Sequence, residues 1–211
     1  LMNILSGVFP PDTGSIEING TQVSFSDTRS AQASGVAMIH QELNLIPGLS
    51  VAENLFLGRE FRSRLGFLDY RRLNAESEGL LAQLELHHLS PSTPVERLRV
   101  GQQQMVEIAK ALSLNSNVII MDEPTSAISE AEVDALFKQI DALKARGVAI
   151  IYITHKLDEV WRAADRVTVL RDGKLVESGC LEDFGRDEVV RLMVGRELNA
   201  ANAARGRRTA T

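Results

Sequence analysis

Two kinds of apolar spacing alternate along this chain, and together they predict an α/β fold. Short apolar runs at Val36–Ile39, Val118–Met121 and Val148–Thr154 have the length and the β-branched content of buried strands. Residues 102–114 and 129–147 instead place their apolar side chains at helical intervals. Strands that alternate with helices are typical of a mainly parallel sheet covered by helices on both faces.

The chain between the first and second of these strands is mostly helical in its pattern. Ser50 and Glu53 have the spacing of a capping box, which marks the start of a helix. Leucines then recur at helical spacing across residues 69–89. We therefore expect a helical subdomain, about residues 49–114, inserted in the α/β core.

Two turn dipeptides predict antiparallel ribbons. Asn19-Gly20 and Asp172-Gly173 each lie between two short segments with strand character. Both dipeptides suit the two-residue turns of β-hairpins. A last helix is expected near Asp187–Val194, where apolar and polar positions again follow a helical period.

The two ends of the chain differ from its middle. Apolar residues from Leu1 to Val8 have helical spacing with no capping residue before them, so the chain is expected to open inside a helix. We expect a partial domain over residues 1–198, with its first core strand missing upstream. Residues 199–211 lack apolar periodicity and are expected to form a tail or linker.

The composition of the chain argues against some classes of function. The 23 basic and 28 acidic side chains give a net charge of -5, which argues against sequence-independent nucleic-acid binding. No apolar run approaches the roughly 18 residues of a membrane helix. The single cysteine, Cys180, excludes an internal disulfide and fits a reducing compartment. A cytosolic protein is expected, one that docks to a membrane if it serves one.

Polar residues follow three of the predicted strands at their carboxyl ends. Gln41 comes after the first strand, Asp122 and Glu123 after the second, and His155 after the third. Ligands of open parallel sheets collect at this edge. Because neighbours on a strand face opposite ways, one carboxylate can hold Mg²⁺ while the other orients a water. Gly101, at a helix start, offers backbone N–H groups to an anion.

Each of these features has a simpler interpretation when taken alone. An isolated Asp-Glu pair is more often a solvated strand end or a helix cap, and a lone histidine at a strand end is more often a surface residue. The buried run before Asp122 and the Pro-Thr-Ser sequence after Glu123 favour a site for phosphoryl transfer.

Taken together, the motifs resemble a known family. Leu98–Gln104, Ile119–Ala127 and Ile153–Lys156, in this order, resemble the ATP-binding cassette of ABC transporters, and the resemblance covers nearly the whole chain. It implies a P-loop NTPase-like fold. More narrowly, His40–Leu45, Glu53–Glu60 and the end of the last helix resemble the first of two tandem cassettes in monosaccharide importers of the ribose, xylose and galactose type.

The resemblance implies roles for the strand-end residues. Asp122 would bind Mg²⁺, and Glu123 would be the general base or the carboxylate that positions water. Gln41 would contact Mg²⁺ and relay to the membrane subunit. His155 would face the γ-phosphate of ATP.

It also implies roles for two further pairs. Gly101 and Gln102 belong to the signature, which would close over ATP held by the opposite cassette. Ser126 and Ala127 would lie in the loop that crosses between cassettes.

The activity implied is hydrolysis of ATP, with Mg²⁺, to energise sugar import. The implied partners are an integral membrane permease, a second ABC cassette and, indirectly, a sugar-binding protein, with no nucleic acid. The implied location is peripheral, on the cytoplasmic face of the cell membrane.

The sequence departs from the family pattern in two places. The 211 residues contain no G-x-x-x-x-G-K-[S/T] loop, which in the family leads directly into the helix that opens this chain. The chain alone is therefore expected to bind ATP weakly and to be weakly active or inactive. Arg99 stands where the family signature has a serine.

Two other interpretations stay open at this point. One is a soluble ABC ATPase of translation or DNA repair. The other is a non-catalytic remnant that docks on a membrane subunit.

Overall fold

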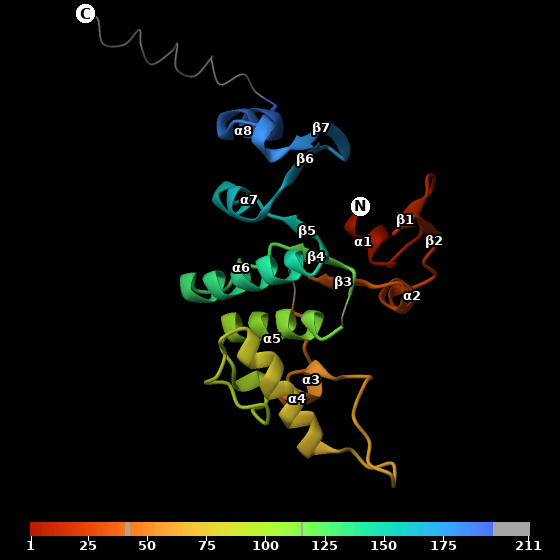
Figure 1. Ribbon diagram of the computed structural model, residues 1–211, viewed down its shortest axis with the longest axis vertical. Coiled ribbons are helices and arrows are strands. Elements are labelled where there is room, and N and C mark those ends of the chain that lie inside the picture. The colour runs from red at the N-terminus through yellow and green to blue at the C-terminus, as the bar shows by residue number, and fades with distance from the viewer. Residues whose placement is uncertain (41–42, 115, 196–211) are drawn as a thin grey trace, which may run out of the picture. The chain divides into compact units, whose positions relative to one another are not determined.

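Figure 1 shows the computed structural model of the chain, which describes residues 1–40, 43–114 and 116–195. The chain divides into two compact units. The first is Leu1–Ile153, and the second begins at Thr154.

A three-stranded parallel sheet forms the centre of the first unit. Its strands are β3 (Val36–Ile39), β4 (Val118–Asp122) and β5 (Ala149–Ile153), in the order β3-β4-β5. Val36 lies opposite Val118, which lies opposite Ala149. The three strands predicted from apolar runs are therefore confirmed, within one or two residues of their expected ends.

Successive residues of β5 contribute to different packing contacts. Ile151 and Ile153 pack against a buried cluster of Phe25, Ala31, Val36 and Ile120. The ring of Tyr152 instead contacts Phe137, with centroids 5.9 Å apart. This alternation follows from the pleat of an extended strand.

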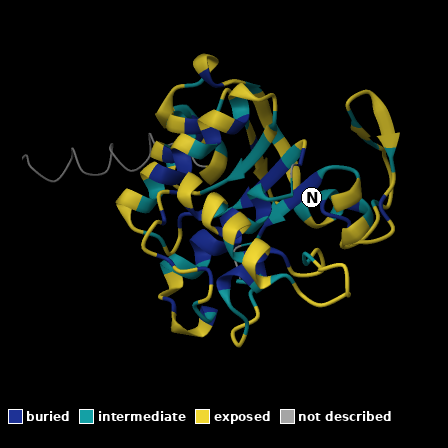
Figure 2. Cartoon of the chain, turned by 60° about the horizontal axis from the view of Figure 1, so that its bottom comes forward, coloured by how far each residue is buried: buried dark blue, intermediate teal, exposed yellow. Residues whose placement is uncertain are grey.

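Helices pack against the two outer strands of the sheet. The helix α2 (Thr28–Ala33) and the helix α5 (Val100–Leu112) pack on β3, and α6 (Glu130–Ala145) packs on β5. The buried parts of these elements are dark blue in Figure 2, and the outward-facing parts of the helices are yellow. The capping box predicted for Ser129 and Glu132 is present at the start of α6.

The expected helices between the first two sheet strands are present. They are α3 (Val51–Leu55), α4 (Tyr70–Gln83) and α5, and each packs against the other two. A 3₁₀ turn, Val95–Arg97, precedes α5. The Ser50–Glu53 capping box is confirmed, whereas α4 ends before the leucines at the end of the predicted stretch, which are buried in the turns that follow.

The first residues form a short helix and a ribbon. Helix α1 spans Met2–Leu5, and strands β1 (Ile16–Ile18) and β2 (Thr21–Val23) pair antiparallel around Asn19-Gly20, as predicted. Helix α2 was not predicted, because its sequence is mostly polar. Its N-cap is Asp27, whose carboxylate accepts a hydrogen bond from the Ser30 amide.

The second unit contains the predicted second hairpin and last helix. Strands β6 (Arg166–Arg171) and β7 (Lys174–Cys180) pair antiparallel with an irregularity between Val169 and Leu170. Helix α8 (Arg186–Val194) follows a 3₁₀ turn at Leu181–Asp183 and packs on β6. Helix α7 (Leu157–Ala163) was not predicted. The tail expected at residues 199–211 lies outside the described residues.

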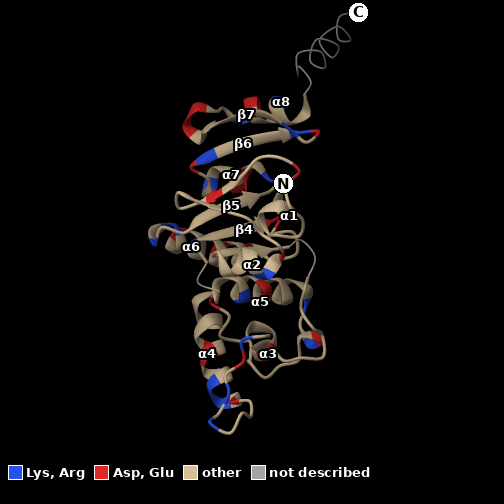
Figure 3. Cartoon of the chain, turned by 90° about the vertical axis from the view of Figure 1, so that its right-hand side faces the viewer, with Lys and Arg blue, Asp and Glu red and all other residues tan. Residues whose placement is uncertain are grey.

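Charged side chains of both signs lie along the first unit. Lys and Arg are interspersed with Asp and Glu along the elements of the first unit (Figure 3). Within residues 1–40, 43–114 and 116–195, no helix has the length and apolar character needed to cross a bilayer.

Candidate functional site

The paired carboxylates stand where β4 ends. Asp122 is the last residue of the strand, and Glu123 has a φ of 46°, in the left-handed region that side chains other than glycine rarely adopt. The Glu123 amide donates to the Ile153 carbonyl at 2.9 Å, and the Glu123 carbonyl accepts from the Ser126 amide at 3.2 Å. The alternation of side-chain direction expected from the sequence therefore stops at Asp122, where the strand ends. The direction of the Glu123 side chain is set instead by its left-handed backbone conformation.

The half-buried Asp122 suits a magnesium ion that is shared with a phosphate ligand. Among the described residues, no three His, Cys, Asp or Glu side chains gather closely enough to hold a metal by themselves. Mg²⁺ is usually bound through one or two carboxylates plus substrate phosphates and waters, so a single strand-end aspartate fits this mode.

The structure brings Gly101 against the loop that contains Ala127. A Cβ placed on Gly101 would lie 2.8 Å from the Ala127 carbonyl oxygen and 3.4 Å from Oε2 of Glu132. Real Cβ contacts are almost never that short, so only glycine fits here without movement of the loop. Two of the predicted ligand-binding segments, one at the start of α5 and one after β4, are thus neighbours in space.

The Gln102 side chain helps to cap the start of α5. Its side-chain Oε1 accepts a hydrogen bond from the Arg99 amide at 3.1 Å. An arginine side chain cannot accept the reciprocal bond of a capping box, so Gln102 caps this helix from one side only. Ser126 and Ala127 are both exposed.

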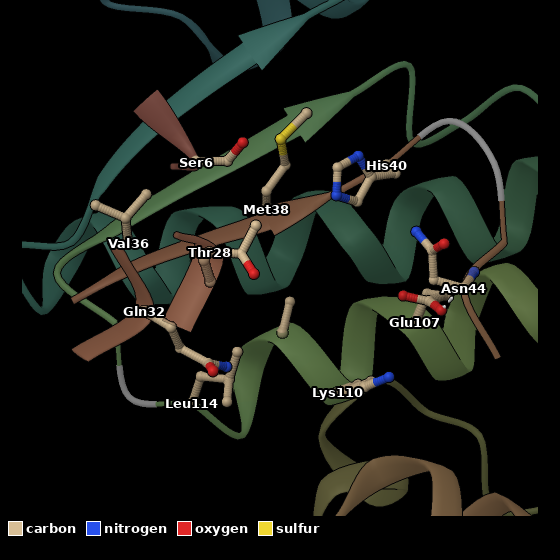
Figure 4. Close-up of a pocket in the computed structure, with 12 residues that line it drawn as sticks. Ser6, Thr28, Gln32, Val36, Met38, His40, Asn44, Glu107, Lys110 and Leu114 are labelled. Atoms are coloured by element: carbon tan, nitrogen blue, oxygen red, sulfur yellow. Dashed lines mark hydrogen bonds between the residues drawn. The ribbon is translucent and has the colours of Figure 1, made fainter. Parts of the chain in front are cut away.

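Gln41 lies outside the described residues, but His40 before it and Asn44 after it line a hollow of about 380 Å³. The hollow lies beside β3 and α5 (Figure 4). His40 lines it from the end of β3, and Glu107 and Lys110 line it from α5. The Glu107 Oε1 atom accepts a hydrogen bond from the Asn44 amide at 2.9 Å, drawn as a dashed line in Figure 4.

Burial makes Glu107 unusual among the carboxylates of the first unit. It is only 7% exposed, and removal from water raises the pKa of its carboxyl above the ordinary value of 4.5. Attraction to Lys110, the hydrogen bond from Asn44 and attraction to His40 act in the opposite direction. Desolvation outweighs these three effects, so the net direction of the pKa shift is upward.

Asn54 fixes the next part of the same segment. Its side chain is completely buried in α3. The Oδ1 atom accepts from the Ile46 amide at 2.7 Å, and Nδ2 donates to the carbonyls of Ile46, Leu49 and Ser50. The chain that follows Gln41 is therefore held by α5 at Asn44 and by α3 at Ile46.

His155 belongs to the second unit, two residues after the end of β5. The residues on either side of it, Thr154 and Lys156, both interact with Glu159 in the first turn of α7. Thr154 Oγ1 donates to Glu159 Oε2 at 2.9 Å, and Lys156 Nζ lies 3.4 Å from Glu159 Oε1.

Sequence reasoning did not find Glu107, Asn54 or Glu159. Each is a polar residue that interrupts a buried helical face, and each is less than 9% exposed. A polar residue on an otherwise apolar helical face was the signal in the sequence that could have identified them. Side-chain partners, however, could not be assigned before the fold was known.

Comparison with known proteins shows the family of the chain. The family profile described as "ABC transporter" matches residues 1–126. The chain is 52% identical over 198 residues to the ribose import ATP-binding protein RbsA of Rhodopirellula baltica, which covers 94% of the chain. It is 52% identical over 199 residues to a putative ribose/galactose/methyl galactoside import ATP-binding protein of Burkholderia lata. The chain spans 39% of the length of each relative.

Solved structures agree on the fold. A nucleotide-free ATP-binding cassette from an ABC transporter superposes with a TM-score of 0.71 at 22% identity, covering 96% of this chain and 81% of its own. A dimeric ATP-binding cassette bound to ADP and Pi superposes with a TM-score of 0.72 at 24% identity, covering 85% and 78%. The α/β cassette fold with its parallel sheet and antiparallel ribbon is thereby confirmed.

Proposed function

Because this chain belongs to the ABC transporter family, we propose that it is part of an ATPase that energises monosaccharide import. The single observation that carries the proposal is the placement of Asp122 and Glu123 where β4 ends, with Glu123 in a left-handed backbone conformation. Strained backbone conformations cluster at active sites. The names of the relatives, which are import proteins for ribose and galactose, support the sugar substrate.

In the proposed reaction, Asp122 would hold Mg²⁺, with Gln41 as a second ligand. When bound, the ion neutralises charge on the phosphates of ATP. Glu123 accepts a proton from the attacking water, or orients that water, and His155 contacts the γ-phosphate. Phosphoryl transfer of this type depends on positioning and charge neutralisation, with little covalent participation by protein groups.

Gly101 and Gln102 are proposed to contact ATP held by a second cassette. The capped start of α5 presents backbone N–H groups, and a helix N-terminus attracts anions. Ser126 and Ala127 are proposed to cross toward that second cassette. Their exposure, and the close approach of Ala127 to Gly101, support one shared contact surface.

The proposed assembly has three other members. An integral membrane permease binds the chain, a second cassette completes the nucleotide site, and a sugar-binding protein delivers the sugar. The chain is proposed to lie peripherally at the cytoplasmic face of the membrane.

A soluble ABC ATPase of translation or DNA repair is less favoured, because the relatives at about 50% identity carry names of sugar importers. Co-purification separates the two. An integral membrane subunit should accompany the protein, whereas ribosomes or DNA in its place would favour the alternative.

The test of the proposed activity uses the chain joined to an upstream phosphate-binding loop. We expect Mg²⁺-dependent ATP hydrolysis that Glu123→Gln abolishes. Glu130→Gln is the matched control, because Glu130 is an exposed carboxylate at the start of α6. Unchanged hydrolysis in Glu123→Gln would remove Glu123 from its role, and absence of hydrolysis in the unsubstituted protein would support the docking remnant.

A second variant tests the signature. Arg99 is bulkier than the serine of the family pattern. Arg99→Ser should therefore raise hydrolysis if the arginine impairs closure over ATP. An unchanged rate would mean that the arginine is tolerated.

A further inference from the structure

Glu159 lies at the centre of a small network around His155. It is 8% exposed, and it lies in the first turn of α7, four residues after the histidine. One carboxylate oxygen accepts the Thr154 hydroxyl at 2.9 Å, and the other lies 3.4 Å from the Lys156 ammonium. A single buried carboxylate thus contacts the residue before His155 and the residue after it.

The backbone closes the network. The Lys156 amide donates to Thr154 Oγ1 at 3.0 Å, and that same hydroxyl donates to Glu159. The donors therefore run in one direction, from the Lys156 amide to the Thr154 hydroxyl and on to the carboxylate. Hydrogen bonds arranged in such a chain polarise and strengthen one another.

The charge of Glu159 adds to this restraint. A buried carboxylate is costly unless it is paired and hydrogen-bonded, and here both conditions are met. Moving Thr154 or Lys156 away would leave a charge with fewer partners in a site shielded from water. The network resists displacement of the two residues that set the backbone of His155.

We propose that Glu159 is a positioning residue that fixes the backbone on both sides of His155 and so holds its imidazole for contact with the γ-phosphate. The proposal rests on the role proposed above for His155. Glu159 acts through Thr154 and Lys156 and does not itself contact ATP.

The chain offers variants that separate the parts of this network. Glu159→Ala removes both interactions, and Glu159→Gln keeps an acceptor for the hydroxyl while losing the charge that faces Lys156. Thr154→Val removes the hydroxyl at nearly constant shape, and Thr154→Ser restores it. Asp158→Asn is the matched control, because Asp158 is an exposed neighbour on α7 that pairs with Arg186 at 2.6 Å.

The first measurement needs no enzymatic activity. The amide order parameter of His155, measured by NMR relaxation, should be near 0.85 in the unsubstituted protein and should fall below about 0.6 in Glu159→Ala and Thr154→Val. Thr154→Ser and Asp158→Asn should keep the higher value. An order parameter that stays high in both Glu159→Ala and Thr154→Val would overturn the proposal, and the two variants together guard against one failing to fold.

The second measurement is ATP hydrolysis by the chain joined to an upstream phosphate-binding loop. Glu159→Ala should lower kcat by roughly tenfold to a hundredfold, as expected for a misplaced catalytic contact, with KM for ATP within about twofold. Reduced order at His155 without a change in kcat would also overturn the proposal. If the unsubstituted protein lacked hydrolysis while the order parameter still fell in the variants, the proposed function would fail and the bracing of His155 would stand.

Discussion

The amide of Glu123 donates a hydrogen bond of 2.9 Å to the carbonyl of Ile153, so the sheet pairing continues one residue beyond the end of β4. Glu123 makes this bond while its φ is 46°. The bond to β5 and the turn to Ser126 together hold a backbone conformation that a glutamate would otherwise avoid. Strain is thus stored at the residue proposed as the catalytic base.

This strain predicts an unusual effect of glycine at position 123. Both Glu123→Gly and Glu123→Ala remove the carboxylate, but only glycine adopts a positive φ without steric cost. The glycine variant should therefore be more stable than the alanine variant by about 1 kcal/mol. Urea unfolding of the two variants measures the difference, and an alanine variant of equal or greater stability would contradict it.

The close approach of Gly101 to Ala127 predicts that a methyl group is not tolerated there. Gly101→Ala should lower the free energy of unfolding by about 1–3 kcal/mol, because the new Cβ would lie 2.8 Å from a backbone oxygen. Gly79→Ala is the matched control, since a Cβ added to Gly79, inside α4, would meet no described atom within 4 Å beyond its chain neighbours and the backbone of its own helix. That control should gain about 1 kcal/mol from helix propensity. Urea unfolding measures the stability of both variants. A Gly101→Ala protein more stable than the unsubstituted one would contradict the packing argument.

The buried Glu107 predicts a pH dependence of stability. Its folded-state pKa is raised above 4.5, so the folded state holds the proton more tightly than the unfolded state does. This contribution to stability is fully present below pH 4.5 and is lost as the pH rises through the folded-state pKa. Glu107→Gln removes this dependence, so its stability relative to the unsubstituted protein should increase as the pH rises above 4.5. Urea unfolding at several pH values measures the difference, and a difference independent of pH would contradict the prediction.

The four hydrogen bonds of Asn54 predict a large local effect. Asn54→Ala should destabilise the 46–50 loop by about 1–3 kcal/mol, because it removes four side-chain hydrogen bonds and leaves the Ile46 amide without its acceptor. Hydrogen exchange at the Ile46 amide should accelerate accordingly. Asn74→Ala, a half-buried position on α4, should change stability by only about 0.5 kcal/mol. Equal exchange rates in the two variants would show that Asn54 does not hold the loop.

Much of the fold was predictable because the local signals were strong. The apolar run before Asp122 and the Ser129–Glu132 capping box each specify an element from a few neighbouring residues. Helices α2 and α7 were not predicted, since both are short and draw on capping or tertiary packing more than on a long apolar face. Short helices of this kind gain little from intrinsic propensity.

The candidate site was predictable as a set of residues but not as a geometry. The strand-end positions of Asp122 and His155 follow from the sequence, because apolar runs end just before them. The left-handed conformation of Glu123 could not be foreseen, since it depends on a hydrogen bond to Ile153. The contact between Gly101 and Ala127 joins segments 26 positions apart and needs the tertiary fold.

The Asn54 side chain also bears on protein engineering. The side-chain amide of Asn54 forms hydrogen bonds with three carbonyls and one N–H of the preceding backbone, all within eight residues of Asn54. The loop is also bonded to residues 91–96, because the Val95 amide donates to the Leu49 carbonyl and the Glu96 amide donates to the Pro47 carbonyl. Grafting residues 46–55 together with residues 91–96 into another scaffold should preserve the loop shape, whereas grafting the same residues without the asparagine should not.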